Sequence, residues 1–292
     1  MIEVRNLTKA FGAKLAVNDL SFSVQRGEVL GFLGPNGAGK STTMRMLTGF
    51  IPPTEGDVEI GGFKIEENPI AVKRLLGYLP ENAPAYADMT VHGFLSFAAE
   101  LRGFRGAEKE RAVDRVVEMC FLGSVLQQSI ETLSKGFRHR TCFAQSIIHD
   151  PAVLILDEPT DGLDPNQKHE VRTLIRQMGE KKAIIFSTHI LEEVEAVCSR
   201  AIIIDSGRIV ANGTPAELKQ RSPHSGAVTV RIVNGDASFV RMKLGELSGG
   251  ERLTMLGESP PAVRIYPRNN SGRGELAAAI GQLAAREDWQ IE

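Results

Sequence analysis

A glycine-rich loop directly follows an apolar run near the start of the chain. Residues 34 to 42 read Gly-Pro-Asn-Gly-Ala-Gly-Lys-Ser-Thr, the pattern GxxxxGK[ST], after Val-Leu-Gly-Phe-Leu at 29 to 33. A glycine turn between a buried strand and a helix lets successive backbone N–H groups point into one concavity. Lys40 adds a positive charge for the β- and γ-phosphates, and the Ser41 hydroxyl can ligand Mg²⁺. A glycine turn that caps an ordinary helix is the alternative.

The loop therefore predicts a bound nucleoside triphosphate with Mg²⁺. The residues expected to hold it are Gly34, Pro35, Asn36, Gly37, Ala38, Gly39, Lys40, Ser41 and Thr42.

Length and composition limit the class of protein. The 292 residues suffice for one large domain and a small one, and 42% hydrophobic with 24% charged residues is a globular composition. A formal charge of −2 gives no basic field for nucleic acid. No apolar run in the sequence reaches the roughly 18 residues that span a bilayer, and the first residues are not a secretion signal. We expect a cytoplasmic chain, or one on the cytoplasmic face of a membrane.

The hydrophobic pattern predicts an α/β core. Residues 2 to 30 alternate apolar and polar positions between glycine turns, which indicates short antiparallel strands. The apolar runs 153–156, 183–186 and 201–204 are too short for helices and fit buried strands of a parallel sheet. A helix is expected from Ser41 to Thr48, and helical spacing between about 88 and 149 predicts a helical subdomain.

The last quarter of the chain is expected to form a separate small domain. A short helix should follow Pro215, and residues 222–226 are the best candidate linker. Beyond it, strands are expected at 228–232 and 263–266, with a helix over 275–287. We predict a first domain at 1–221 and an α+β domain at 227–292.

Two acids follow the predicted strand at 153–156. Asp157 is placed to hold Mg²⁺, usually through water, and Glu158 to polarise an attacking water as general base. A solvated strand end is the alternative interpretation of this pair. Its presence in one chain with the phosphate loop favours a hydrolytic site.

The pentapeptide Leu-Ser-Lys-Gly-Phe at 133–137 lies upstream of this acid pair. With it the chain resembles the ATP-binding subunits of ABC transporters, in which the corresponding pentapeptide is Leu-Ser-Gly-Gly-Gln. The resemblance implies that Ser134 and Gly136 clamp the γ-phosphate of a nucleotide held by a second subunit. Lys135 and Phe137 depart from the family pattern at its third and fifth places.

The resemblance implies roles for four further residues. Asp164 lies in the loop through which the two subunits communicate, and His189 contacts the γ-phosphate and Glu158. Glu81 replaces a family glutamine, and its carboxylate can still ligand Mg²⁺ or hold a water. Phe11 corresponds to an aromatic residue that stacks on adenine. The alternative for Phe11 is an exposed aromatic residue at a strand end. The alternative for His189 is a structural role.

A second copy of the pentapeptide pattern lies in the tail. Residues 247–252 read Leu-Ser-Gly-Gly-Glu-Arg, closer to the family pattern than 133–137. No downstream strand ending in carboxylates completes a site there. We interpret this stretch as a turn leading into a strand from Leu253.

The resemblance covers residues 1 to about 220 and implies a P-loop ABC ATPase core. Two copies would face head to tail and sandwich two ATP molecules. ATP hydrolysis would power an exporter with a separate membrane subunit, which we expect to touch the chain near Glu81 and residues 83–91. Packing between domains of the chain is the alternative interpretation of residues 83–91. The export group that resembles this chain most includes drug, copper-related and gliding-motility systems.

Two other classes of function fit this sequence less well. A non-transport ABC ATPase acting in translation or DNA maintenance usually has tandem cassettes, long coiled-coil insertions or basic extensions, and this sequence has none. A P-loop kinase or GTPase lacks support because the guanine-reading pattern Asn-Lys-x-Asp does not occur. No nucleic-acid partner is expected.

Overall fold

The computed structural model describes residues 1–82, 84–221, 227–247, 250–267 and 273–292. The chain divides into two compact units, Met1–Pro215 and Ala216–Glu292. This boundary lies inside the domain predicted at 1–221, because it falls after Pro215, the first residue of helix α8 (Pro215–Arg221).

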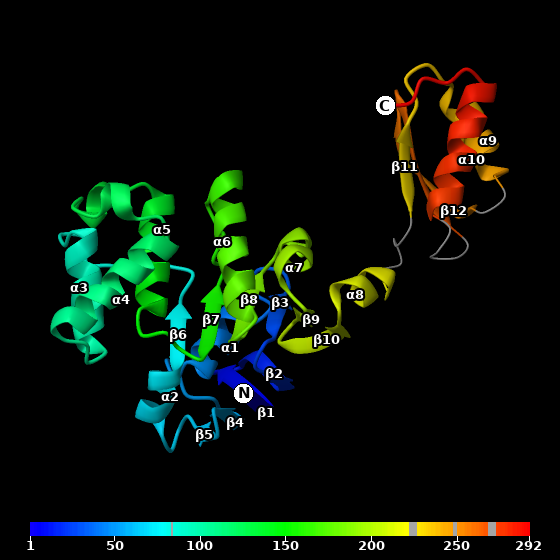
Figure 1. Ribbon diagram of the computed structural model, residues 1–292. Coiled ribbons are helices and arrows are strands. Elements are labelled where there is room, and N and C mark those ends of the chain that lie inside the picture. Colours follow the sequence, from blue (N-terminus) through cyan, green and yellow to red (C-terminus); the bar gives the residue numbers. More distant parts are fainter. Residues whose placement is uncertain (83, 222–226, 248–249, 268–272) are drawn as a thin grey trace. The chain divides into compact units, whose positions relative to one another are not determined.

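A six-stranded sheet forms the centre of the first unit (Figure 1). Its order is β10-β9-β3-β8-β7-β6, and all neighbours are parallel except β10, which runs antiparallel to β9. Every residue of β7 and β8 is buried, so the apolar runs do form central strands as predicted. The strands are β3 (Val29–Leu33), β6 (Leu76–Leu79), β7 (Val153–Asp157), β8 (Ala183–Thr188), β9 (Arg200–Asp205) and β10 (Arg208–Gly213).

The N-terminal strands form a second, antiparallel sheet of order β2-β1-β4-β5. One apolar core joins it to the parallel sheet through helix α1 (Lys40–Leu47), whose Met44 and Leu47 are fully buried. The rings of Phe22 and Phe32, from β2 and β3, have centroids 5.7 Å apart. The strands are β1 (Ile2–Phe11), β2 (Lys14–Val24), β4 (Glu55–Ile60) and β5 (Phe63–Lys64).

The helical subdomain lies beside the edge strand β6 in Figure 1. Its longest helices are α3 (Val91–Leu101), α4 (Gly106–Met119) and α5 (Lys135–Ile147). The Thr90 side chain begins α3 by accepting a hydrogen bond from the Gly93 N–H at 3.0 Å. The remaining helices of this unit are α2 (Pro69–Leu75), η1 (Gly123–Val125), η2 (Ile130–Thr132), α6 (Pro165–Gly179) and α7 (Leu191–Val197).

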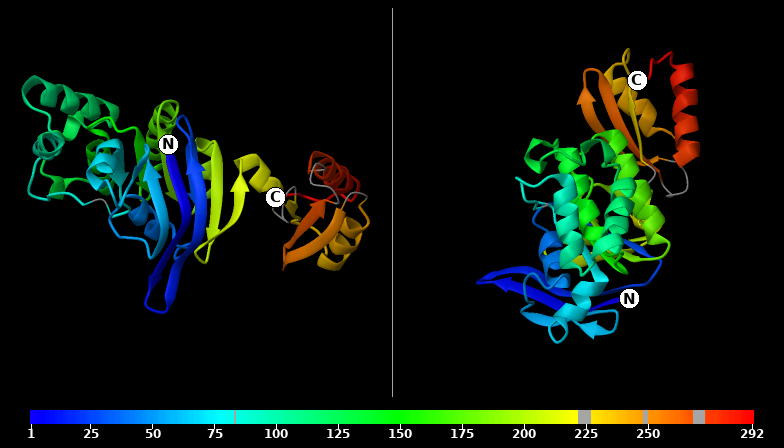
Figure 2. Two further views of the ribbon diagram at one scale, coloured as in Figure 1. Left: turned by 90° about the horizontal axis from the view of Figure 1, so that it is seen from below. Right: turned by 60° about the vertical axis from the view of Figure 1, so that its left-hand side comes forward.

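The second unit has a three-stranded antiparallel sheet of order β11-β13-β12 (Figure 2). Along the chain, helix α9 follows β11 and helix α10 follows β13. An isolated bridge from Ile232 to Ile291 brings the chain end beside β11. This β-α-β-β-α arrangement matches the split βαβ motif. Helix α9 was not predicted, although Asp236 caps it by accepting from two N–H groups at 3.0 Å. The elements are β11 (Val228–Arg231), α9 (Ala237–Gly245), β12 (Gly250–Glu258), β13 (Pro261–Pro267) and α10 (Arg273–Arg286).

Residues 248 and 249 of the second pentapeptide lie outside the described residues. The strand that follows begins at Gly250, three residues before the expected start at Leu253.

All three cysteines are buried. Burial raises the pKa of Cys120, Cys142 and Cys198 to about 12, so they are unreactive core residues. Within the described part of the chain, no helix is both long and apolar enough to cross a membrane.

Candidate nucleotide-binding and hydrolysis site

The candidate site lies at the carboxyl ends of the parallel strands. The register pairs Leu33 of β3 with Thr188 of β8, and Ser187 of β8 with Asp157 of β7. Because parallel strands end at one edge of the sheet, the loops that follow them meet there. Motifs that lie far apart in the sequence are therefore close together in the structure.

The phosphate loop connects β3 to α1 in a conformation that requires glycine. Gly37 and Gly39 have φ of 81° and 106°, in the left-handed region. A Cβ on Gly39 would lie 2.6 Å from the carbonyl oxygen of Ala16. Helix α1 begins at the next residue, so its free N–H groups and positive dipole end face the loop's concavity.

Lys40 is buried against this loop. Its Nζ donates to the carbonyl oxygens of Gly34 at 2.7 Å and Pro35 at 3.3 Å. The same Nζ lies 3.5 Å from Oε1 of Glu158. The ammonium thus bridges the phosphate loop and the proposed general base.

A cavity of about 390 Å³ opens beside these groups. It brings together nine of the residues predicted to form the site and three that the sequence analysis did not single out. The predicted lining residues are Asn36, Gly37, Gly39, Lys40, Ser41, Thr42, Glu81, Glu158 and His189, and the others are Lys14, Ala16 and Asp161.

The acid pair is held by the neighbouring strand. Ser187 donates its hydroxyl to Oδ1 of Asp157 at 2.5 Å and accepts the Glu158 N–H at 3.1 Å. Glu158 has φ of 51°, a left-handed conformation that is uncommon for a residue with a side chain. Such backbone strain is concentrated at functional sites.

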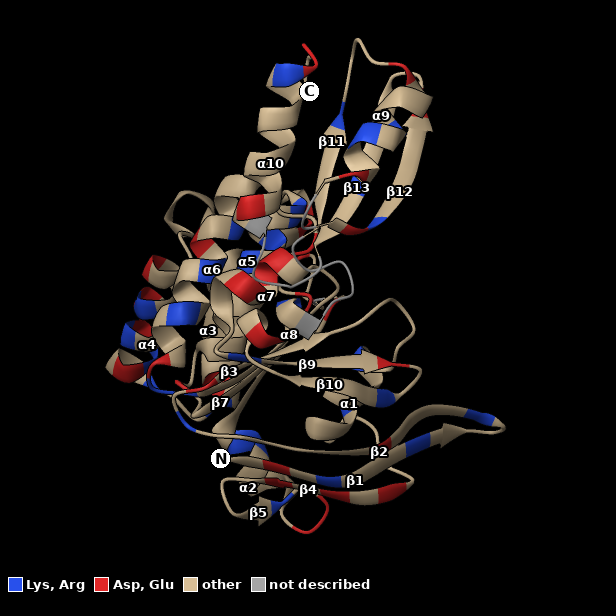
Figure 3. Cartoon of the chain, turned by 90° about the vertical axis from the view of Figure 1, so that its right-hand side faces the viewer, with Lys and Arg blue, Asp and Glu red and all other residues tan. Residues whose placement is uncertain are grey.

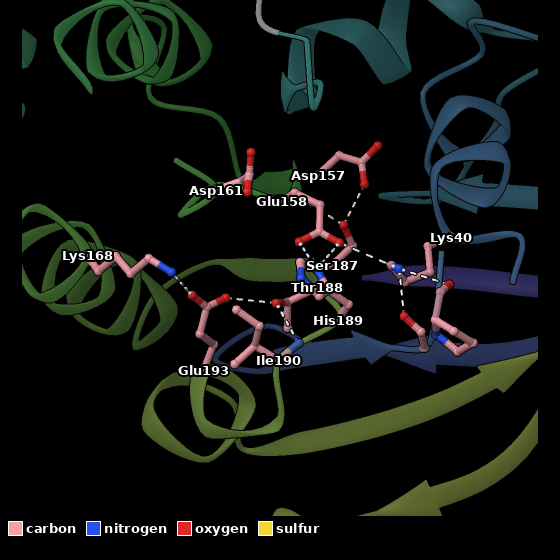
Figure 4. Close-up of polar contacts among 12 residues, drawn as sticks. Lys40, Asp157, Glu158, Asp161, Lys168, Ser187, Thr188, His189, Ile190 and Glu193 are labelled. Atoms are coloured by element: carbon pink, nitrogen blue, oxygen red, sulfur yellow. Dashed lines mark hydrogen bonds and ion pairs between the residues drawn. The ribbon is translucent and has the colours of Figure 1, made fainter. Parts of the chain in front are cut away.

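His189 hydrogen-bonds the Glu158 carboxylate through Nδ1, at 3.2 Å from Oε1 and 3.1 Å from Oε2 (Figure 4). Burial raises the pKa of Glu158, while the charge of Lys40 and the hydrogen bond from His189 oppose this shift. A carboxylate with a raised pKa is a better general base near neutral pH.

The oxygens near the phosphate loop suit a hard cation. Mg²⁺ prefers oxygen ligands and usually keeps several waters and substrate phosphates, so a few protein oxygens suffice. Ser41 and Glu81 line the cavity. Asp157 is the buried last residue of β7 and is not among the lining residues. These three residues would hold the ion.

Ser134, Gly136 and Asp164 are not among the cavity's lining residues. Ser134 is the N-cap of α5, and its Oγ accepts from the Phe137 N–H at 3.3 Å. Asp164 is the N-cap of α6 and accepts from the Gln167 N–H at 2.9 Å. A Cβ on Gly136 would lie 2.3 Å from Oε1 of Gln167, so the two helix starts are packed together.

Besides Asp157, four other predicted residues also lie outside the lining. Gly34 and Pro35 act through their carbonyl oxygens on Lys40, and Ala38 is buried. Phe11 ends β1, is 52% exposed and lies under Nζ of Lys9 at 5.3 Å. The hairpin pairs Phe11 with Lys14, which does line the cavity.

Comparison with known proteins gives a consistent result. The family model described as ABC transporter matches residues 17–161. The linearmycin resistance ATP-binding protein LnrL of Bacillus subtilis is 36% identical, over 76% of this chain and 71% of its own length. The Nod factor export ATP-binding protein I of Bradyrhizobium diazoefficiens is 34% identical, over 94% of this chain and 90% of its own length.

Solved structures agree. The structure of an ATP-binding subunit of an ABC transporter has a TM-score of 0.70 at 31% identity and covers 76% of this chain and 92% of its own. A dimeric ATP-binding cassette bound to ADP and Pi has a TM-score of 0.68 over 74% of this chain and 99% of its own. At 22% identity, that second likeness shows the fold alone.

Proposed function

Since the chain belongs to the ABC transporter family as an ATP-binding, ATP-hydrolysing subunit, we propose that it powers export through a membrane subunit encoded as a separate polypeptide. Two relatives support export, because their names describe linearmycin resistance and Nod factor export. The likeness to the second relative extends over nearly the whole chain, including the C-terminal unit. On this proposal the chain lies at the cytoplasmic face of the membrane.

The main support for ATPase chemistry is the contact of Glu158 with both Lys40 and His189. The N–H groups of the phosphate loop and the Lys40 ammonium bind the triphosphate, and Mg²⁺ would neutralise developing charge on the phosphate oxygens. Glu158 accepts a proton from the attacking water, and His189 holds the carboxylate in place. Ser41, Asp157 and Glu81 would hold the metal ion.

A second copy of the chain would complete each site. The clamp residues Ser134 and Gly136 lie at the start of α5 and outside the cavity that holds Lys40. Free N–H groups and a positive dipole end at a helix start favour a phosphate. The phosphate they would meet therefore belongs to a nucleotide on the partner copy, and Asp164 would meet the same partner.

A second cavity, of about 480 Å³, is the proposed docking site of the membrane subunit. The ring of Tyr86 is 56% exposed and contacts Phe94 and Phe97 edge-on. A short apolar helix would bury these rings. Predicted contact residue 83 lies outside the described residues, and the described lining is Pro84, Ala85, Tyr86, Phe94, Phe97, Ala98, Leu101, Arg102 and Gln145.

Charge supports transport over a role on nucleic acid. In the cartoon of Figure 3, Lys and Arg positions are interspersed with Asp and Glu positions along the described helices and strands. The formal charge is −2. A nucleic-acid protein would need a concentrated basic surface.

The test is recovery of a complex from membranes. A tagged chain, co-expressed with the membrane protein of the neighbouring reading frame, should copurify with it in detergent, and the complex should hydrolyse ATP. The Lys40→Ala chain should copurify without hydrolysing. Copurification with ribosomes or DNA in place of a membrane protein would contradict the proposal.

A further inference from the structure

Glu193 is a buried acid that the proposed chemistry does not use. It lies in α7, and its side chain is 4% exposed. Burying a carboxylate is costly unless it is paired and hydrogen-bonded. The two partners that offset this cost come from two other elements, β8 and α6.

The first partner is Thr188, which directly precedes His189. Its hydroxyl donates to Oε2 of Glu193 at 2.7 Å and accepts the Ile190 N–H at 3.1 Å. The residues on both sides of His189 are therefore joined through one hydroxyl to one buried carboxylate (Figure 4). This arrangement restricts the backbone that aims the imidazole at Glu158.

The second partner is Lys168, in the first turn of α6. Its Nζ lies 3.2 Å from Oε1 of Glu193. Its backbone N–H donates to the carbonyl oxygen of Asp164 at 2.9 Å. Glu193 thus connects the end of β8 to the helix start that carries Asp164.

We propose that Glu193 is a positioning residue: it holds His189 on Glu158 and couples that position to the Asp164 loop. The proposal rests on the proposed function, because it assumes that Glu158 and His189 act in ATP hydrolysis and that Asp164 meets a second copy. Movement of the Asp164 loop on dimer closure would reach His189 through Lys168, Glu193 and Thr188. Polar contacts link these side chains directly.

Steady-state ATPase kinetics on the full chain test this proposal. Thr188→Val removes the hydroxyl and nearly keeps the volume, so kcat should fall about tenfold to a hundredfold, as for a displaced catalytic group. KM for ATP should change by less than about twofold, because the phosphate loop that binds ATP is unchanged. Thr188→Ser restores the hydroxyl and should recover kcat.

The ion pair between Glu193 and Lys168 offers a second test. Glu193→Gln keeps an acceptor for Thr188 but leaves the Lys168 ammonium without its carboxylate, so kcat should fall. Adding Lys168→Met removes that unpaired charge and should recover part of the loss. Lys182→Met is the matched control. It breaks the 2.6 Å ion pair with Asp150 just before β8 begins, at the end of the strand away from Thr188. The kcat of this variant should stay unchanged.

The His189→Ala background separates positioning from folding. There, Thr188→Val should cause no further loss, because residues that act as one unit are not additive. An additive loss, or a parallel rise in KM, would overturn the positioning role. If the parent chain hydrolyses ATP and Thr188→Val leaves kcat unchanged, this inference alone fails. If the parent chain does not hydrolyse ATP, the proposed function fails.

Discussion

Nζ of Lys40 lies 3.5 Å from Oε1 of Glu158, and both side chains are at least 90% buried. The phosphate-binding cation and the proposed base therefore form an ion pair at the edge of the sheet. A γ-phosphate entering the cavity would compete with this carboxylate for the ammonium, because both are oxyanions. On the proposed function, phosphate binding would therefore free Glu158 from Lys40.

Replacing Glu158 with Gln should separate ATP binding from hydrolysis. The amide keeps the side chain's shape but is not a base, so kcat should fall at least about a hundredfold. ATP binding should be retained, because Lys40 loses a competitor. Size-exclusion chromatography with ATP should show a dimer. Glu180→Gln, at an exposed glutamate, is the control, and normal turnover in Glu158→Gln would remove Glu158 as the base.

The pH dependence of kcat should report the environment of Glu158. Burial raises its pKa above the usual 4.5, with Asp157 acting in the same direction and Lys40 and His189 in the other. The ionised carboxylate is the active form, so kcat should fall as pH drops through this raised pKa. The decline should begin at a higher pH than for an exposed glutamate. A profile that stays flat down to pH 4.5 would contradict the shift.

Lys135 departs from the family pattern, and the structure gives it a partner. Its Nζ lies 3.0 Å from Oδ2 of Asp161, with the two side chains 67% and 56% exposed. An exposed pair contributes little, so Lys135→Ala should change the free energy of unfolding by less than about 1 kcal/mol. Urea unfolding of this variant and the parent would measure it. A loss of several kcal/mol would show that the contact is structural.

Tyr86 tests the proposed docking site. Tyr86→Ala removes an exposed ring from the second cavity and should leave the ATPase rate of the isolated chain unchanged. Recovery of the membrane subunit in the copurification experiment should fall. The control is Phe63→Ala, which removes another exposed ring outside that cavity's lining. Equal recovery with both variants would exclude this surface as the docking site.

The elements that could be predicted from the sequence are those whose pattern reflects complete burial. The runs at 153–156 and 183–186 form central strands because both of their faces are covered. Helix α9 was missed because only Val240 and Leu244 of its nine residues are buried, which leaves a weak periodic pattern. The Asp236 cap was the available signal.

Site residues with a local motif could be anticipated, and those defined by tertiary packing could not. The phosphate loop and Glu158 each belong to a recognisable stretch. Lys14 and Asp161 line the cavity only because a hairpin and a turn are brought to it by other elements. Glu193 likewise gains its contacts from α6 and β8, and its sequence neighbours do not reveal them.

The most direct test of the two-copy site mixes two inactive chains. Lys40→Ala removes the phosphate-binding cation, and Ser134→Arg places a bulky cation where the clamp should meet the partner's nucleotide. In a mixed dimer arranged head to tail, one site carries both changes and the other carries neither. Each variant alone should be inactive, and the mixture should recover ATPase activity. A mixture no more active than its separate components, with mixed dimers present, would contradict a site shared between two copies.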